Sequence, residues 1–175
     1  MGSSAVLTAD SLAVMFERHW RALFGYCARR VGPDVAEDLV SSTFLVAYER
    51  RERFDPARAE ALPWLYGIAT NLVRRHRRDE LRAYRMFART GVDPLACDDG
   101  DRAAERADGA LLARRIAGVL MELPARQRDV LLLFAIGQLE YVEIAQALNI
   151  PLGSVQSALH RARTKLRAAL SEGVS

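Results

Sequence analysis

Residues 141–170, YVEIAQALNIPLGSVQSALHRARTKLRAAL, decide the fold of the C-terminal part of the chain. They predict a short helix over 141–148, a turn at Asn149-Ile150-Pro151 and a longer helix to about Leu170. The apolar side chains of the longer helix recur every three or four residues and predict a buried stripe of Val155, Leu159, Ala162, Leu166 and Leu170. Ala145 is small enough for the two helices to cross closely. The stretch therefore predicts a helix-turn-helix.

The other side of the longer helix is polar, and residues 151–171 contain no acid. Its amide, hydroxyl, imidazole and guanidinium groups suit the edges of DNA bases, and basic side chains that include Arg167 flank them and can hold phosphates. An ordinary amphipathic helix with a solvated basic face is the alternative, but the preceding short helix and turn favour DNA reading. The candidate reading residues are Gln156, Ser157, His160, Arg161, Arg163 and Lys165.

The sequence before this motif predicts two more helices of the same domain, one over 110–123 and one that starts at Pro124 and is closed by Gly137. The N-terminal part predicts three helices. The first covers about 11–31. The second has Asp34 as its N-cap with Glu37 completing a capping box, and it ends near Arg53. The third starts at Pro63 and runs through the arginines up to Arg78. We therefore expect an all-α protein.

A change of charge separates these two parts. Residues 74–90 hold seven arginines and two acids, whereas residues 91–110 hold six acids and two arginines together with Gly and Pro and no apolar period. Such a stretch is typical of a flexible linker. We expect two small helical domains, 10–82 and 110–172, joined by an acidic linker over 83–109.

Several functional classes find no support in the sequence. The two cysteines and three histidines are scattered and have no zinc-ligand spacing, and there is no phosphate-binding glycine loop or nucleophile elbow. We expect no metal, no cofactor and no enzymatic activity. Neither a membrane span of roughly 18 apolar residues nor a secretion signal is evident, so a cytoplasmic protein is expected.

Four segments, in order, resemble the extracytoplasmic-function (group IV) sigma factors of the sigma-70 family. PDVAEDLVSSTFLVAYER (33–50) resembles region 2.2, and LPWLYGIATNLVRRHRR (62–78) resembles the end of region two. The acidic joint lies where the family has its interdomain linker. LPARQRDVLLLFAIGQLEYVEIAQALNIPLGSVQSALHRARTKL (123–166) resembles region four, and its HRAR ending after the GSV turn is characteristic.

This resemblance implies a factor that binds core RNA polymerase and directs promoter recognition, DNA opening and transcription initiation. In the family, region two is a bundle of three or four helices that binds the clamp coiled coil of the largest polymerase subunit and opens the minus-ten element. Region four is a four-helix domain that reads the minus-35 element as duplex and sits on the flap of the second-largest subunit. An anti-sigma factor is a common further partner.

The resemblance also carries site residues over by position. Those expected to bind core polymerase are Asp38, Ser41, Ser42, Phe44 and Glu49. Those expected to handle the single-stranded minus-ten element, with the 54–62 loop holding an extruded base, are Phe54, Asp55, Trp64, Asn71, Arg74, Arg75 and Arg78. The chain departs from the family pattern at Ser41-Ser42, which replaces Gln and an acid. It departs again at Ala158, which replaces a frequent arginine, and at Gln156, which replaces a basic residue and favours adenine.

Two alternatives stay open on the residues alone. The first is a free-standing helix-turn-helix regulator whose N-terminal domain senses a ligand or dimerises. The second is a helical interaction module that does not bind DNA. The cationic run at 74–78 is equally compatible with nucleic-acid contact and with a solvated helix end.

Overall fold

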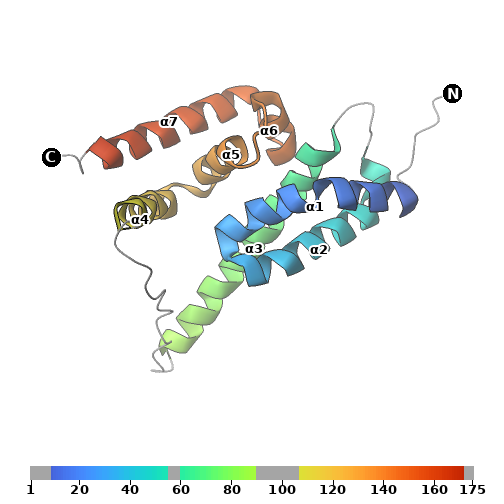
Figure 1. Ribbon diagram of the computed structural model, residues 1–175, viewed down its shortest axis with the longest axis horizontal. Coiled ribbons are helices and arrows are strands. Elements are labelled where there is room, and N and C mark those ends of the chain that lie inside the picture. Colours follow the sequence, from blue (N-terminus) through green and yellow to red (C-terminus); the bar gives the residue numbers. More distant parts are fainter. Residues whose placement is uncertain (1–8, 55–59, 90–106, 172–175) are drawn as a thin grey trace.

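The chain folds into two groups of helices that lie side by side (Figure 1). The computed structural model describes residues 9–54, 60–89 and 107–171. Its elements are α1 (Ala9–Val31), α2 (Pro33–Glu49), the 3-10 turn η1 (Arg51–Arg53), α3 (Ala61–Arg89), α4 (Ala107–Glu122), α5 (Ala125–Ala135), α6 (Tyr141–Leu148) and α7 (Leu152–Ser171). The predicted all-α fold with two small helical domains is confirmed. None of the described helices combines the length and the apolar character needed to cross a bilayer.

The N-terminal domain is a bundle in which α1 packs on α2 and α3 packs on both. Leu23, Val40, Leu65 and Val73 are fully buried where these helices meet. An aromatic pair reinforces the contact between α1 and α3, because Tyr26 meets Tyr66 edge to face with 5.1 Å between ring centroids. The second half of α3 projects beyond this bundle (Figure 1).

The start of α2 differs from the expected capping box, and that prediction is wrong. Helix α2 begins at Pro33, its N-cap is Gly32, and no side chain caps it. Gly32 has φ of +85°, a conformation that glycine adopts without steric cost, and Pro33 suits the first helical turn because its missing N–H would have no partner there. Asp34 lies inside the first turn, where its charge favours the helix dipole.

Helix α3 is longer than expected at both ends. It begins at Ala61, so Pro63 lies in its first turn, and it continues to Arg89, into the segment predicted as linker. Arginine and alanine are the most frequent residues of the extension beyond Arg78, and both are good helix formers. Asp79 lies 3.9 Å from Arg75 and 3.6 Å from Arg82, pairs that add a little local stability.

The C-terminal domain places α4, α5 and α6 against α7. Val130, Leu133, Ile144 and Val155 are fully buried at the centre of this group. Helix α6 has the predicted bounds and ends at Asn149, whose φ of +50° makes it a left-handed C-cap. The sharp turn that follows brings α7 back across α6, which is the predicted helix-turn-helix.

Candidate nucleic-acid interface and the junction between the domains

Helix α7 has one buried and one exposed side, as its sequence predicted. Val155 and Ala162 are fully buried and Leu159 is nearly so. The exposed residues include most of the candidate reading set, namely Gln156, Ser157, His160, Arg161 and Lys165. The polar side chains therefore point away from the domain core and are available to a duplex.

Two hollows flank the exposed side of α7. One, of about 260 Å³, is lined in part by Gln156, His160 and Arg163. The other, of about 320 Å³, is lined in part by Ser157 and Arg161. The reading residues thus form a ridge between two basic hollows, an arrangement that can present donors to base edges and cations to the phosphates on either side.

Packing restrains two further residues on this helix. The Arg163 guanidinium lies over the Phe134 ring, 4.7 Å from its centroid, and this cation–π contact holds the cation in place. Ala158, where the resemblance implies an arginine, is only 5% exposed. Its small side chain is therefore part of the packing as well as a lost cation.

Helix α2 carries the residues expected to bind core polymerase. Asp38, Ser41 and Glu49 are exposed and Ser42 is half-buried. Phe44 is only 5% exposed and packs on Phe16, with 4.8 Å between ring centroids. Phe44 thus packs on the buried side of α2, and a direct contact with polymerase would need Phe44 to move.

Leu45 and Tyr48, on the same helix, were not among the residues predicted for this site. Leu45 is 60% exposed and Tyr48 is 40% exposed. Both follow Asp38 and Ser41 at steps of three and four residues, which place them on one side of α2. The same spacing, read from the sequence, could have predicted that Leu45 and Tyr48 share the exposed side of α2 with Asp38 and Ser41.

The residues expected to handle the minus-ten element occupy two places. Phe54 and Trp64 stack with 4.7 Å between ring centroids, and Phe54 is buried. Asp55 lies outside the described residues. On α3, Asn71, Arg75 and Arg78 are exposed at steps of four and three, so they share one side of the helix.

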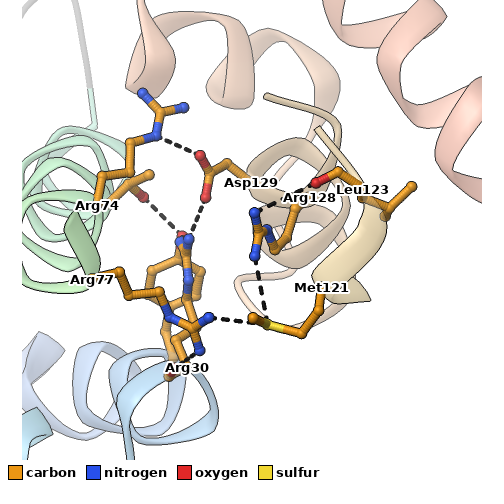
Figure 2. Close-up of polar contacts among 9 residues, drawn as sticks. Arg30, Arg74, Arg77, Met121, Leu123, Arg128 and Asp129 are labelled. Carbon is orange, nitrogen blue, oxygen red and sulfur yellow. Dashed lines mark hydrogen bonds and ion pairs between the residues drawn. The ribbon is translucent and has the colours of Figure 1, made fainter. Parts of the chain in front are cut away.

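Arg74 instead reaches the junction between the two domains, where it meets a buried carboxylate (Figure 2). Its Nε lies 2.5 Å from Oδ2 of Asp129 on α5, and Arg30 of α1 donates to the other oxygen, Oδ1. Asp129 is fully buried. Two guanidiniums from one domain thus neutralise one carboxylate from the other, as a buried charge requires.

A chain of hydrogen bonds continues from this ion pair into the N-terminal domain. Arg30 also donates to the Tyr26 hydroxyl, which is 2.8 Å from the Thr70 hydroxyl. Burial raises the pKa of Tyr26 to about 12, so its phenol stays neutral at ordinary pH. The junction is therefore anchored in the core of the bundle.

The backbones of the two domains also approach closely at Gly67. A Cβ atom placed on Gly67 of α3 would lie 2.3 Å from the carbonyl oxygen of Ala147 on α6. Only glycine allows this approach. The sequence signal was an isolated glycine inside a helical pattern, which often has a packing reason.

We expect Gly67→Ala to weaken the closed arrangement of the domains by about 1–3 kcal/mol, because the new methyl group would overlap backbone. The same change should make α3 itself a better helix by about 1 kcal/mol. Small-angle X-ray scattering should therefore report a larger radius of gyration while the helical circular dichroism is retained.

Gly25→Ala is the matched control, since Gly25 also lies in a helix and a Cβ there would meet nothing within 4 Å. If both variants keep the wild-type radius of gyration, the close approach at Gly67 does not hold the domains together.

Comparison with known proteins matches both domains in the same order. Residues 15–83 match the model of Sigma-70 region 2, and residues 113–166 match that of Sigma-70, region 4. The ECF RNA polymerase sigma factor SigW of Bacillus subtilis is 31% identical over 93% of this chain and 90% of its own length. The RNA polymerase sigma factor CarQ of Myxococcus xanthus is 31% identical over 93% of this chain and 91% of its own length.

Solved structures support the fold. The sigma factor RpoE from Bartonella quintana, in complex with the anti-sigma factor NepR, superposes with a TM-score of 0.67 at 20% identity and covers 93% of this chain and 98% of its own. CnrH, in complex with the cytosolic domain of CnrY, gives a TM-score of 0.65 at 24% identity and covers 95% of this chain and 91% of its own.

Proposed function

The chain belongs to the extracytoplasmic-function sigma factors of the sigma-70 family, and from this membership we propose how its two domains divide the work of starting transcription. It binds core RNA polymerase and directs promoter recognition and transcription initiation. The observation that carries this function is the match of both sigma regions, in order, by relatives that span most of the chain. We propose that it acts in the cytoplasm as a specificity subunit with no reaction of its own.

Helix α7 is proposed to read the minus-35 element. The exposed Gln156, Ser157, His160 and Arg161 form its reading ridge, and Arg163 and Lys165 supply phosphate contacts. A glutamine can pair with both hydrogen-bonding groups of an adenine edge in the major groove. Gln156 is therefore the residue expected to set this factor apart from relatives with a cation there.

The N-terminal domain is proposed to hold the minus-ten element in its opened form. The exposed stripe of Asn71, Arg75 and Arg78 on α3 can follow a strand backbone. Trp64 stacks on Phe54, the first residue of the 54–62 segment that is expected to receive an extruded base. Capturing an unstacked base offsets part of the free energy spent on opening, a few kcal/mol. Arg74 belongs to this set, and its ion pair with Asp129 has to break before Arg74 can contact DNA.

The exposed side of α2 is proposed as the surface for the polymerase clamp. Asp38, Ser41 and Glu49 supply its polar contacts, and Leu45 and Tyr48 supply apolar area. Apolar contacts of this kind compensate for the absence of the family's usual Gln and acid at Ser41-Ser42. The flap of the second-largest subunit is the expected site for the C-terminal domain.

An anti-sigma factor is the expected further partner. The solved RpoE structure that this chain resembles is a complex with the anti-sigma factor NepR. A partner of this kind would act by covering surfaces that polymerase or DNA needs.

Run-off transcription on a cognate promoter tests the function. Core polymerase alone should give no specific transcript, and adding this protein should give one, because α2 docks on core while α7 and α3 select the promoter. Binding to duplex promoter DNA alone, with no gain on adding core polymerase, would instead indicate a free-standing helix-turn-helix regulator.

A further inference from the structure

A basic hollow of about 550 Å³ lies at the junction between the two domains. Among the described residues that line it are six arginines, one on α1, three on α3 and two on α5: Arg30, Arg74, Arg77, Arg78, Arg126 and Arg128. Its size is in the range of sites for small molecules, about 300–1,000 Å³. Both domains contribute walls, so the hollow exists only when the domains are together.

Among the residues that the structure describes, the charges lining this hollow do not balance. Asp129 is the one acid among the described residues that line it, and it already pairs with Arg30 and Arg74. The other four lining guanidiniums have no acid beside them in the described part of the wall. Bringing like charges together at a partly dry junction costs free energy unless an anion joins them.

Two of these guanidiniums point at the same neutral atom (Figure 2). From α3, Arg77 places a nitrogen 3.1 Å from the Met121 sulfur, and from α5 Arg128 places one 3.7 Å from the same sulfur. A thioether is a weak acceptor. Their remaining bonds go to backbone oxygens, Arg77 to that of Arg30 and Arg128 to that of Leu123 at 3.4 Å.

The neighbouring positive charges change the pKa of Arg77. Burial lowers its pKa, and the nearby charges of Arg128 and Arg30 lower it further. A bound anion would reverse that effect by supplying the missing opposite charge.

We propose that this hollow binds a small polyphosphate anion, with its phosphates held between Arg77 and Arg128. Guanidinium forks bind phosphate oxygens in pairs, and two forks from different domains fit a ligand with more than one phosphate. Leu81 and Met121 add apolar surface to the wall and are 56% and 59% exposed. A nucleoside polyphosphate can use this surface for its base, and an inorganic polyphosphate cannot.

Binding at this site has a consequence for the whole molecule. Because the walls come from both domains, a bound polyphosphate stabilises the closed arrangement, in which Asp129 holds Arg74. The ligand would therefore oppose promoter opening. This consequence rests on the proposed minus-ten role of Arg74, whereas the binding site itself does not.

Isothermal titration calorimetry on the full chain tests the site, with sodium tripolyphosphate as the probe and no divalent metal present. We expect one tripolyphosphate per chain, and a loss of affinity of about 100-fold in the Arg77→Gln, Arg128→Gln double variant, since each charged hydrogen-bonded contact is worth about tenfold or more. ATP titrated in parallel separates the two ligand sources. Tighter binding of ATP, weakened by Met121→Ser, identifies the nucleoside form, and equal binding identifies the inorganic form.

Arg161→Gln is the matched control, because Arg161 is an exposed arginine of α7 that does not line this hollow. It should keep tripolyphosphate binding within twofold while it loses promoter activity, so the two proposals fail separately. Equal loss in the control, or several anions per chain, would show general attraction to basic surface and overturn the site. No binding to wild type, with binding restored by neutralising Asp98, Asp99 and Asp101, would show that the chain's own acids fill the hollow and would also overturn it.

Discussion

Replacing Asp129 with alanine is expected to separate the two domains. The Arg30 side chain is 5% exposed and that of Asp129 is 1% exposed, so the change would leave a buried guanidinium without its carboxylate. Removing one partner of a buried ion pair costs about 3–5 kcal/mol, which lowers the ratio of closed to open molecules by two to four powers of ten, taking about 1.4 kcal/mol for each. Opening hydrates Arg30, so the expected response is separation rather than unfolding.

The radius of gyration from small-angle X-ray scattering should rise in Asp129→Ala, while helical circular dichroism stays near that of wild type. Asp79→Ala is the control. Asp79 is also an acid paired with arginines, since it lies 3.9 Å from Arg75 and 3.6 Å from Arg82, but it is exposed. An exposed pair contributes less than about 1 kcal/mol. A wild-type scattering curve for Asp129→Ala would mean that the ion pair does not hold the domains together.

Reversing the charge of Arg161 should have the largest effect on function. Arg161 is exposed on the reading ridge of α7, so the substitution leaves the buried stripe intact. A good base or phosphate contact by arginine is worth about 1–3 kcal/mol, and a glutamate in its place adds repulsion from the phosphates. We expect Arg161→Glu to lower promoter-specific transcription by about 100-fold, with binding to core polymerase unchanged.

Multiple-round transcription from a promoter with an intact minus-35 element gives the measurement. Arg114→Glu carries the same charge change at an exposed position on α4 and should stay within twofold of wild type. If Arg161→Glu transcribes as well as Arg114→Glu does, the DNA-reading surface lies elsewhere than the ridge of α7.

The local part of this structure could be predicted because its causes are local. The spacing of Val155, Leu159 and Ala162 predicted which side of α7 is buried, and Asn149 marked the end of α6. The start of α2 was misplaced because Gly32 supplies the unusual backbone angle that lets Pro33 open the helix, and a plausible capping pattern hid it. Two starting signals competed, and only the backbone geometry decides between them.

The junction could not be predicted in the same way. Arg74 and Asp129 are 55 residues apart in the chain, and no local sequence pattern around either residue predicts that they form an ion pair. An arginine that reads as one of a cationic run is in fact engaged with a carboxylate of the other domain, and its neighbour Arg75 is exposed. Gly67 gave a partial signal, since a glycine within a helix suggests a close approach without saying to what.

Lys165, exposed on α7, is the single lysine of the chain. Reagents that acylate lysine side chains therefore have one target in this protein, and that target lies on the helix proposed to read DNA. An acyl group there removes one positive charge and leaves the buried side of the helix untouched. The rate at which this amine is acylated, followed by mass spectrometry, thus becomes a one-residue gauge of whether the minus-35 surface is occupied.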